Sequence, residues 1–102
     1  MSTLHTVNKS PFTFTTLSSC LQLCGKSDSI LLLEDGVFGA MNSAPCTQEI
    51  SKLVEQGVKV YALEGDVKAR GLQEKIRTDI IVTDYCGFVQ LTTEHRCVQS
   101  WY

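Results

Sequence analysis

The sequence lacks the features of several common classes of protein. Nine of its 102 residues are Lys or Arg and eleven are Asp or Glu, so the formal net charge is −2, and no segment gathers basic residues. Direct binding of RNA or DNA needs a basic surface, and we expect none. The longest aliphatic run, Ile30–Leu33, is far too short to span a bilayer. With no basic, apolar leader at the start, we expect no signal peptide, no membrane attachment and a cytoplasmic location.

Nucleotide-binding motifs are also absent. Neither Gly-x-x-x-x-Gly-Lys-Ser/Thr nor Gly-x-Gly-x-x-Gly follows the first predicted strand, which ends in Asn8–Pro11. Asp35 follows a predicted strand, but the acidic cluster that a phospho-acceptor aspartate needs after the first strand is missing. The pair Asp35 and Gly36 is more typical of a turn. We therefore expect no cofactor.

Strand and helix patterns alternate along the chain. Strands are predicted at residues 4–7, 29–33, 58–63 and 79–82, helices within 14–24, 45–56, 65–76 and 84–91, and a helical turn at 37–41. This alternation predicts an α/β fold, a mostly parallel sheet with helices on both faces. The length is that of a single domain, residues 1–102.

Polar segments follow four of the predicted strands. They are residues 8–10, 34–36, 64–66 and 83–84. The carboxyl ends of parallel strands share one edge of a sheet, and ligands of such sheets bind beyond that edge. We therefore expect these segments to form one rim, and any second chemical site to lie there.

Five cysteines are a high count for a chain of this size. In a reducing cytoplasm they are expected to be thiols, and an odd number cannot all pair within the chain. Cys20 and Cys24 are four residues apart on a predicted helix, where their Cβ atoms are about 6 Å apart, too far for a disulfide. A zinc site is not expected, because no second pair stands at zinc-finger spacing and His5 and His95 are distant in sequence.

Cys20 is the leading candidate for a reactive thiol. At about 100° per residue, Phe14, Leu17, Leu21 and Cys24 form one apolar stripe, and Cys20 lies about 80° from its centre. A thiol on this flank can reach solvent or a partner, whereas a buried cysteine is an inert small hydrophobe.

The remaining candidates carry weaker signals. Cys46 follows Pro45 at a predicted helix start, where backbone N–H groups favour a thiolate, and it is the second candidate. Cys86 and Cys97 adjoin apolar or aromatic residues and are expected to pack. His5 lies within a strand, where a hydrogen-bonded structural histidine is expected.

Five segments together resemble the DsrH/TusB family of small sulfur-relay proteins. They are Leu4–Pro11, Ile30–Val37, Val60–Leu63, Asp66–Gly71 and Asp84–Thr92. The resemblance implies a DsrE/F-type α/β fold and a heterohexamer with homologous DsrE/TusD-type and DsrF/TusC-type subunits, two copies of each. In that family persulfide sulfur passes from one cysteine to the next, which requires no metal or nucleotide. The chain is then a sulfur-transfer subunit rather than a stand-alone enzyme.

Two branches of the family differ at the position of Cys20. The branch resembling TusB serves thiolation of the wobble uridine in tRNA and typically has an aliphatic residue there. The branch resembling DsrH, from sulfur-oxidising bacteria, has a cysteine and works with a DsrC-type carrier. Cys20 matches the second pattern, so the resemblance implies a sulfur-carrying thiol in sulfur oxidation. The alternative is a TusB-type subunit, served by a TusE-type carrier, with a structural role and no reactive cysteine.

The end of the chain is unusually apolar. Val98, Trp101 and Tyr102 stand where termini are usually polar and frayed. Trp and Tyr are enriched at interfaces. We therefore expect the tail Cys97–Tyr102 to pair with the sheet edge or to pack between subunits, and the isolated chain to self-associate.

Overall fold

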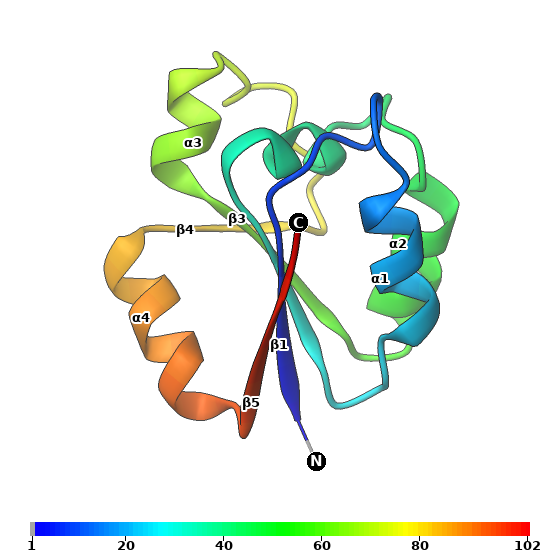
Figure 1. The fold of residues 1–102 in the computed structure, drawn as a ribbon. Helices are drawn as coiled ribbons and strands as arrows, with labels where there is room; N and C mark the ends of the chain where they lie inside the picture. Colours follow the sequence, from blue (N-terminus) through cyan, green and yellow to red (C-terminus); the bar gives the residue numbers. More distant parts are fainter. Residues whose placement is uncertain (1) are drawn as a thin grey trace.

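The computed structural model describes residues 2–102, which form a five-stranded sheet flanked by helices (Figure 1). The strands are β1 (Thr3–Val7), β2 (Ser29–Leu32), β3 (Lys59–Leu63), β4 (Ile81–Thr83) and β5 (Cys97–Trp101). Their order across the sheet is β4-β3-β2-β1-β5, and all four pairings are parallel. The α/β fold predicted from the alternating pattern is confirmed.

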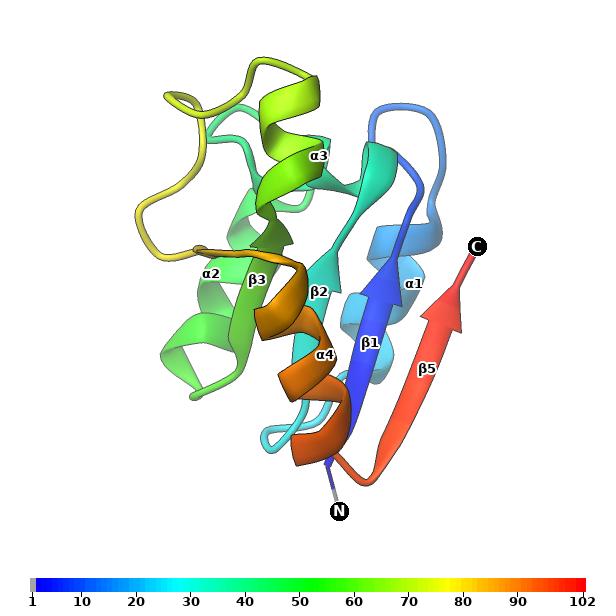
Figure 2. The ribbon, with the colours of Figure 1, turned by 90° about the vertical axis from the view of Figure 1, so that its left-hand side faces the viewer.

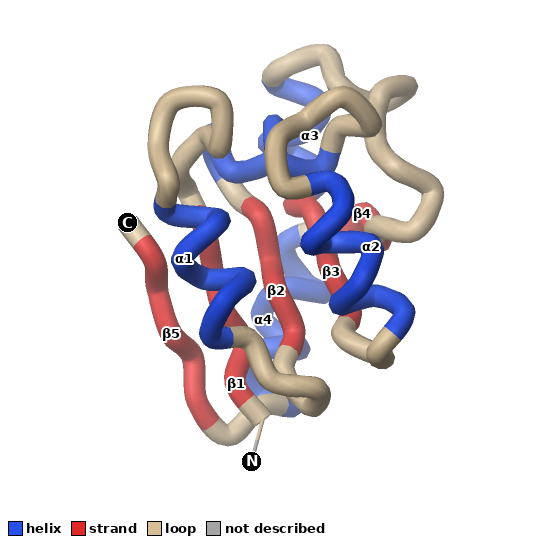
Figure 3. Tube along the Cα trace, turned by 90° about the vertical axis from the view of Figure 1, so that its right-hand side faces the viewer, coloured by secondary structure: helices blue, strands red, loops and turns tan. Residues whose placement is uncertain are grey.

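Helices cover both faces of the sheet. They are α1 (Thr16–Leu23), α2 (Thr47–Glu55), α3 (Glu64–Ala69), α4 (Tyr85–Glu94) and the 3-10 helix η1 (Glu34–Ala40). Figure 2 shows α4 in front of the sheet, and Figure 3 shows α1 and α2 on the opposite side. Of the helices in residues 2–102, none has the length and apolar character needed to cross a membrane.

The two faces of the sheet bury cores of different size. The larger core lies under α1 and α2 and includes Val7, Leu17, Cys20, Ile30, Leu32, Ile50, Val60 and Ala62. The smaller core lies under α4 and consists of Leu4, Leu31 and Leu91 with partly buried neighbours. All four residues of β2 are buried, as expected for a central strand covered on both faces.

Local signals located most element ends correctly. Gly57 ends α2 with a φ of 101°, a left-handed conformation that favours glycine. Asp84 caps α4, since its carboxylate accepts the Gly87 N–H at 2.8 Å. Two helices are shorter than predicted. The first begins only at Thr16, and α3 ends at Ala69 instead of continuing to 76.

The apolar tail is a strand, which confirms one of the two arrangements expected for it. β5 pairs with β1 over five residues, from Thr3 with Cys97 to Val7 with Trp101. The chain reaches this edge from β4 at the far edge, and α4 makes the crossing (Figure 1). The first and last strands of the protein therefore lie side by side.

Candidate functional site

Cys20 lies in the larger core with no exposed surface. The flank position expected for it was wrong, because Phe14 lies outside α1 and is half exposed. Without Phe14, the buried stripe of the helix is Leu17, Cys20 and Leu21. In this structure the Cys20 thiol is out of reach of solvent.

Burial also keeps the Cys20 thiol protonated. Desolvation, and after it the charges of Cys24 and Asp28, raise its pKa to about 12. A thiol must ionise to attack sulfur, so Cys20 does not have the properties of an active nucleophile in this conformation.

The other cysteine predictions also need correction. Cys46 precedes α2 with a φ of 68° and is half-buried, and burial followed by Glu49 raises its pKa. The thiolate expected at this helix start is thus disfavoured. Cys86 and Cys97 are exposed, so the expectation that they pack in a core was wrong.

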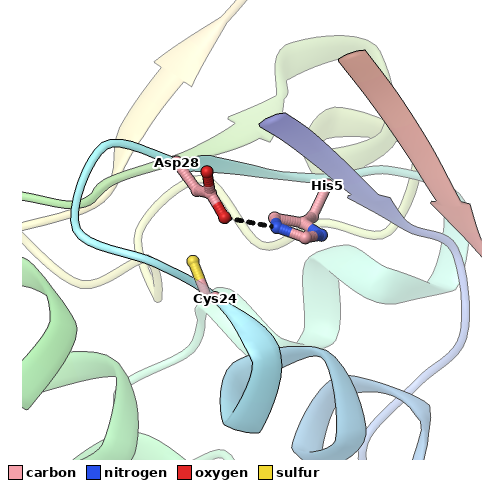
Figure 4. A group of neighbouring side chains, drawn as sticks. All are labelled: His5, Cys24 and Asp28. Carbon is pink, nitrogen blue, oxygen red and sulfur yellow. Dashed lines mark hydrogen bonds and ion pairs between the residues drawn. The ribbon is translucent and has the colours of Figure 1, made fainter. Parts of the chain in front are cut away.

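A polar cluster lies just beyond the C-terminal end of α1 (Figure 4). It consists of His5 on β1, Cys24 directly after α1, and Asp28 directly before β2. One ligand atom from each, a ring nitrogen, a sulfur and a carboxylate oxygen, lie within 4.8 Å of one another. The distance in sequence between His5 and Cys24 had argued against a shared metal site, but the fold brings the two side chains together.

Asp28 is the best anchored member of the cluster. Its Oδ1 accepts the Thr3 N–H at 3.0 Å, and its Oδ2 accepts the Gly25 N–H at 2.9 Å and a bond from His5 Nε2 at 2.9 Å. Burial by itself would raise the pKa of Asp28, but the hydrogen bonds and the nearby imidazole lower it overall. The carboxylate is therefore ionised and fixed in place.

His5 is held from both sides, and its partners define its tautomer. The indole N–H of Trp101 can only donate, and it lies 3.1 Å from His5 Nδ1. Nδ1 must therefore accept, and the ring proton is on Nε2, which donates to Asp28. The neutral imidazole has no free nitrogen to remove a proton from a thiol, so the structural role expected for His5 is supported by its contacts.

Cys24 is a half-buried thiol next to this pair. Its Sγ lies 3.7 Å from the Gly25 carbonyl, to which the S–H donates weakly. Burial and then the charge of Asp28 raise its pKa to about 11. No local pattern in the sequence indicates this cluster, apart from the polar loop before β2, because its members come from three separate segments.

A hollow of about 290 Å³ lies at the amino edge of the sheet, opposite the rim that was expected to hold a second site. Its lining includes Lys26, Asp28, Ser29, Lys59, Tyr61, Glu94 and His95. The carboxyl-edge segments do meet, since the Glu34 N–H donates to Asp66 Oδ2 at 2.7 Å. Within residues 2–102, however, the hollow at the amino edge borders Asp28 and none of the polar segments at the carboxyl edge of the sheet.

Within the hollow, Ser29 and His95 form a hydrogen-bonded pair. His95 Nδ1 lies 2.7 Å from the Leu91 carbonyl and must donate to it, so Nε2 accepts from the Ser29 hydroxyl at 2.9 Å. The pair joins the end of α4 to the start of β2. The contact therefore ties α4 to the amino edge of the sheet, which is a structural role.

The fold and the cluster define a small single-domain α/β protein with a five-stranded parallel sheet and two thiols, Cys20 and Cys24, on and directly after one helix. A model of the DsrH-like protein family matches residues 9–98. Protein TusB of Escherichia coli K12 is 40% identical over 98 residues, covering 96% of this chain and 99% of TusB. TusB of Escherichia coli O1:K1 matches to the same extent. The chain belongs to the DsrH/TusB family.

Solved structures share the fold at low sequence identity. The ychN protein from Escherichia coli superposes with a TM-score of 0.84 at 16% identity, covering 98% of this chain and 99% of ychN. MTH1491 from Methanobacterium thermoautotrophicum gives a TM-score of 0.75 at 18% identity, covering 97% of each chain. These likenesses establish the architecture, and function has to be argued from the family and the site.

Proposed function

We propose that this protein is a TusB-type subunit of a sulfur-relay complex that serves 2-thiolation of the wobble uridine in tRNA. The observation that carries the proposal is the 40% identity with TusB over nearly the whole of both chains. The family's relay passes persulfide sulfur between cysteines, and the subunit proposed here orients its partners and does not itself carry sulfur. This is the alternative left open by the sequence, and it is preferred over sulfur oxidation.

The state of the cysteines supports a structural role. Cys20, the candidate sulfur carrier, is fully buried, and its pKa is raised to about 12. Cys24 has a pKa raised to about 11 and lies next to a carboxylate that repels a thiolate. Neither thiol on α1 is ready to attack a persulfide, so the reacting cysteine belongs to another subunit in this proposal.

The proposed partners are DsrE/TusD-type and DsrF/TusC-type subunits in a heterohexamer, with a TusE-type carrier. Exposed apolar side chains on β4, α4 and β5 support an assembly role. They are Ile81, Val82, Tyr85, Val89 and Val98. β4 and β5 are the two edges of the sheet, and each of these edge strands exposes apolar side chains that a partner subunit would cover.

Complementation tests this proposal. An Escherichia coli strain that lacks TusB would receive this chain or its Cys20→Ala variant, and thiolated wobble uridine would be measured by mass spectrometry of tRNA nucleosides. We expect both to restore the modified base, because the variant removes only a buried thiol. A well-folded Cys20→Ala protein that fails where the unmodified chain succeeds would overturn the structural role.

A second function, sulfur oxidation with a DsrC-type carrier, is favoured by one observation, the cysteine at position 20. It requires Cys20 to become accessible in the complex and to take sulfur. After incubation with a persulfidated partner, mass spectrometry would find added sulfur on the unmodified chain but not on Cys20→Ser. An adduct that persists in Cys20→Ser would exclude Cys20, and Cys24 or Cys46 would then be examined by peptide mapping.

A further inference from the structure

The cluster of His5, Cys24 and Asp28 presents three different donor atoms to one point. Imidazole nitrogen, thiolate sulfur and carboxylate oxygen are the three ligand types that Zn²⁺ takes in proteins. The residues come from β1, from the end of α1 and from the loop before β2, so the fold itself gathers them. Figure 4 shows the Cys24 sulfur directed toward the His5–Asp28 pair.

The three ligand atoms lie close enough to share one tetrahedral cation after a local rearrangement of side chains. His5 Nε2 and Asp28 Oδ2 are 2.9 Å apart, and all three ligand atoms lie within 4.8 Å. Two ligands at usual Zn–N and Zn–O lengths are about 3.3 Å apart in a tetrahedral site. The His5 ring must therefore shift by a few tenths of an ångström, and Cys24 Sγ must approach the pair, because a sulfur ligand lies about 3.6 Å from its neighbouring ligand atoms in a tetrahedral zinc site.

Electrostatics in the cluster also favour a cation. An Asp28 carboxylate and a Cys24 thiolate are like charges, and the ligand atoms of the cluster lie within 4.8 Å of one another. A divalent cation between the two would neutralise both negative groups and remove this repulsion. The side chains of His5 and Asp28 are only 7% and 11% exposed, so the interaction is weakly screened by water.

Supporting groups and a route of access are present. The backbone N–H groups of Thr3 and Gly25 already orient the Asp28 carboxylate, as outer partners of metal ligands do. Cys24 is only half-buried, and Asp28 borders the hollow at the amino edge of the sheet, so two of the three ligands lie near solvent.

We propose that His5 Nε2, Cys24 Sγ and an Asp28 carboxylate oxygen bind one zinc-class divalent cation, with a fourth position open to water. Three protein ligands and one open position is the arrangement in which zinc retains an exchangeable ligand. The proposal concerns this chain alone and does not depend on the relay function.

Binding redistributes protons in a defined way. The Cys24 thiol loses its proton to solvent and forms a sulfur–metal bond. The His5 proton moves from Nε2 to Nδ1, because Nε2 now donates its lone pair to the metal. Protonated Nδ1 can no longer accept from Trp101, so the 3.1 Å hydrogen bond is lost. Binding should therefore release about one proton per ion and change the surroundings of the indole.

Trp101 makes the site observable, because it is the only tryptophan in the chain. The purified full-length protein, with exposed Cys86 and Cys97 replaced by serine, would be titrated with Co²⁺ and then Zn²⁺ as chlorides. We expect one equivalent to bind, a thiolate-to-cobalt absorption band that zinc abolishes, and a parallel change in Trp101 fluorescence.

Ligand variants decide the assignment. Cys24→Ser should remove the cobalt band and weaken zinc binding by more than about tenfold, and His5→Gln should weaken it similarly. Cys46→Ser is the matched control, since Cys46 is also half-buried but outside the cluster, and it should bind as the parent does. Circular dichroism would establish that each variant is folded. If His5→Gln does not fold, Asp28→Asn provides the second ligand variant.

Three results would overturn the proposal. The parent protein would bind neither ion, or a folded Cys24→Ser variant would keep the parent's affinity, or Cys46→Ser would lose as much as Cys24→Ser. Because the experiment uses no relay partner and no tRNA, its outcome is separate from that of the complementation test.

Discussion

Trp101 Nε1 and His5 Nδ1 are joined by a 3.1 Å hydrogen bond between residues 96 positions apart in sequence. The bond links the last strand to the first, and through His5 it reaches Asp28 in the loop before β2. The rings are also in contact, with centroids 6.2 Å apart. The edge strand β5 is thus held by a series of side-chain hydrogen bonds as well as by its backbone pairing with β1.

Replacing the indole should loosen this edge. In Trp101→Phe the Nδ1 acceptor of buried His5 loses its donor, and the smaller ring fills less of the space beside the larger core. We expect a loss of about 1–3 kcal/mol in the free energy of unfolding, measured in urea. Tyr102→Phe is the control and should stay within about 0.5 kcal/mol, because Tyr102 is 86% exposed. Equal effects of the two changes would contradict the role of the bond.

The buried thiol predicts a loss of stability at alkaline pH. The pKa of Cys20 is about 12 in the folded chain against an ordinary value of 9.0. Between these values the unfolded state loses the proton first, so unfolding becomes more favourable as pH rises. The stability that the protonated Cys20 thiol contributes to the folded state is fully present below about pH 9 and is lost by about pH 12.

Urea unfolding from about pH 8 to about pH 10.5 would measure this effect. Cys20→Ala should show a shallower decline of unfolding free energy with pH, whatever its stability at neutral pH. The control is Cys86→Ser, which replaces an exposed thiol. A Cys20→Ala curve parallel to that of the unmodified chain would mean that Cys20 ionises freely in the folded protein.

Arg77 should be the most important charged side chain for stability among residues 2–102. Its side chain is 7% exposed, and its guanidinium donates two hydrogen bonds to the Asp79 carboxylate. It also donates to the Thr47 carbonyl at 2.8 Å and to Ser51 Oγ at 2.6 Å. These bonds fix the loop after α3 against α2. Arg77→Met keeps the length but leaves the acceptors without donors, and we expect a loss of roughly 2–4 kcal/mol in unfolding free energy.

Arg70→Met is the comparison for Arg77→Met. Arg70 bonds to Asp35, but the Asp35 side chain is 61% exposed, so the ion pair is screened by solvent. The expected loss is below about 1 kcal/mol. Thermal or urea unfolding would measure both variants. The same loss of unfolding free energy in both would mean that the buried hydrogen bonds of Arg77 stabilise the fold no more than a surface ion pair does.

Local chemistry explains which parts of the fold could be predicted. The apolar run at Ile30–Leu33, the break at Gly57 and the cap at Asp84 each depend on a few neighbouring residues, and each was predicted correctly. The position of Cys20 on α1 was not, because the angle of a side chain relative to the core depends on which residues join the helix. Once Phe14 lies outside α1, the centre of the apolar stripe shifts toward Cys20, from about 80° away to about 50° away, and Cys20 falls within the buried stripe.

The polar cluster could not be predicted from local patterns at all. His5 meets Asp28 because β1 pairs with β2, and Trp101 reaches His5 only because β5 returns to pair with β1 after the crossing by α4. The aromatic tail indicated that the end of the chain is packed, but the sequence offered no information on which strand it would join. Long-range adjacency of this kind is a property of the topology and not of any segment.

Self-association of the isolated chain is the last prediction. Deleting the tail after Arg96 is a poor test, because it removes β5 and the Trp101–His5 bond and so lowers the stability of the monomer. A point change on the exposed surface is cleaner. Val98 on β5 is 47% exposed and faces the same side of the sheet as Leu4, which packs in the core under α4.

We expect Val98→Lys to shift the protein toward monomer in sedimentation velocity at equal concentrations, because a desolvated ammonium opposes an apolar contact. Leu23→Lys is the matched control, since Leu23 is 70% exposed on α1, which covers the opposite face of the sheet. It should sediment as the unmodified chain does. Identical sedimentation of Val98→Lys and Leu23→Lys, or a monomeric unmodified chain at every concentration, would exclude this face as the contact between copies.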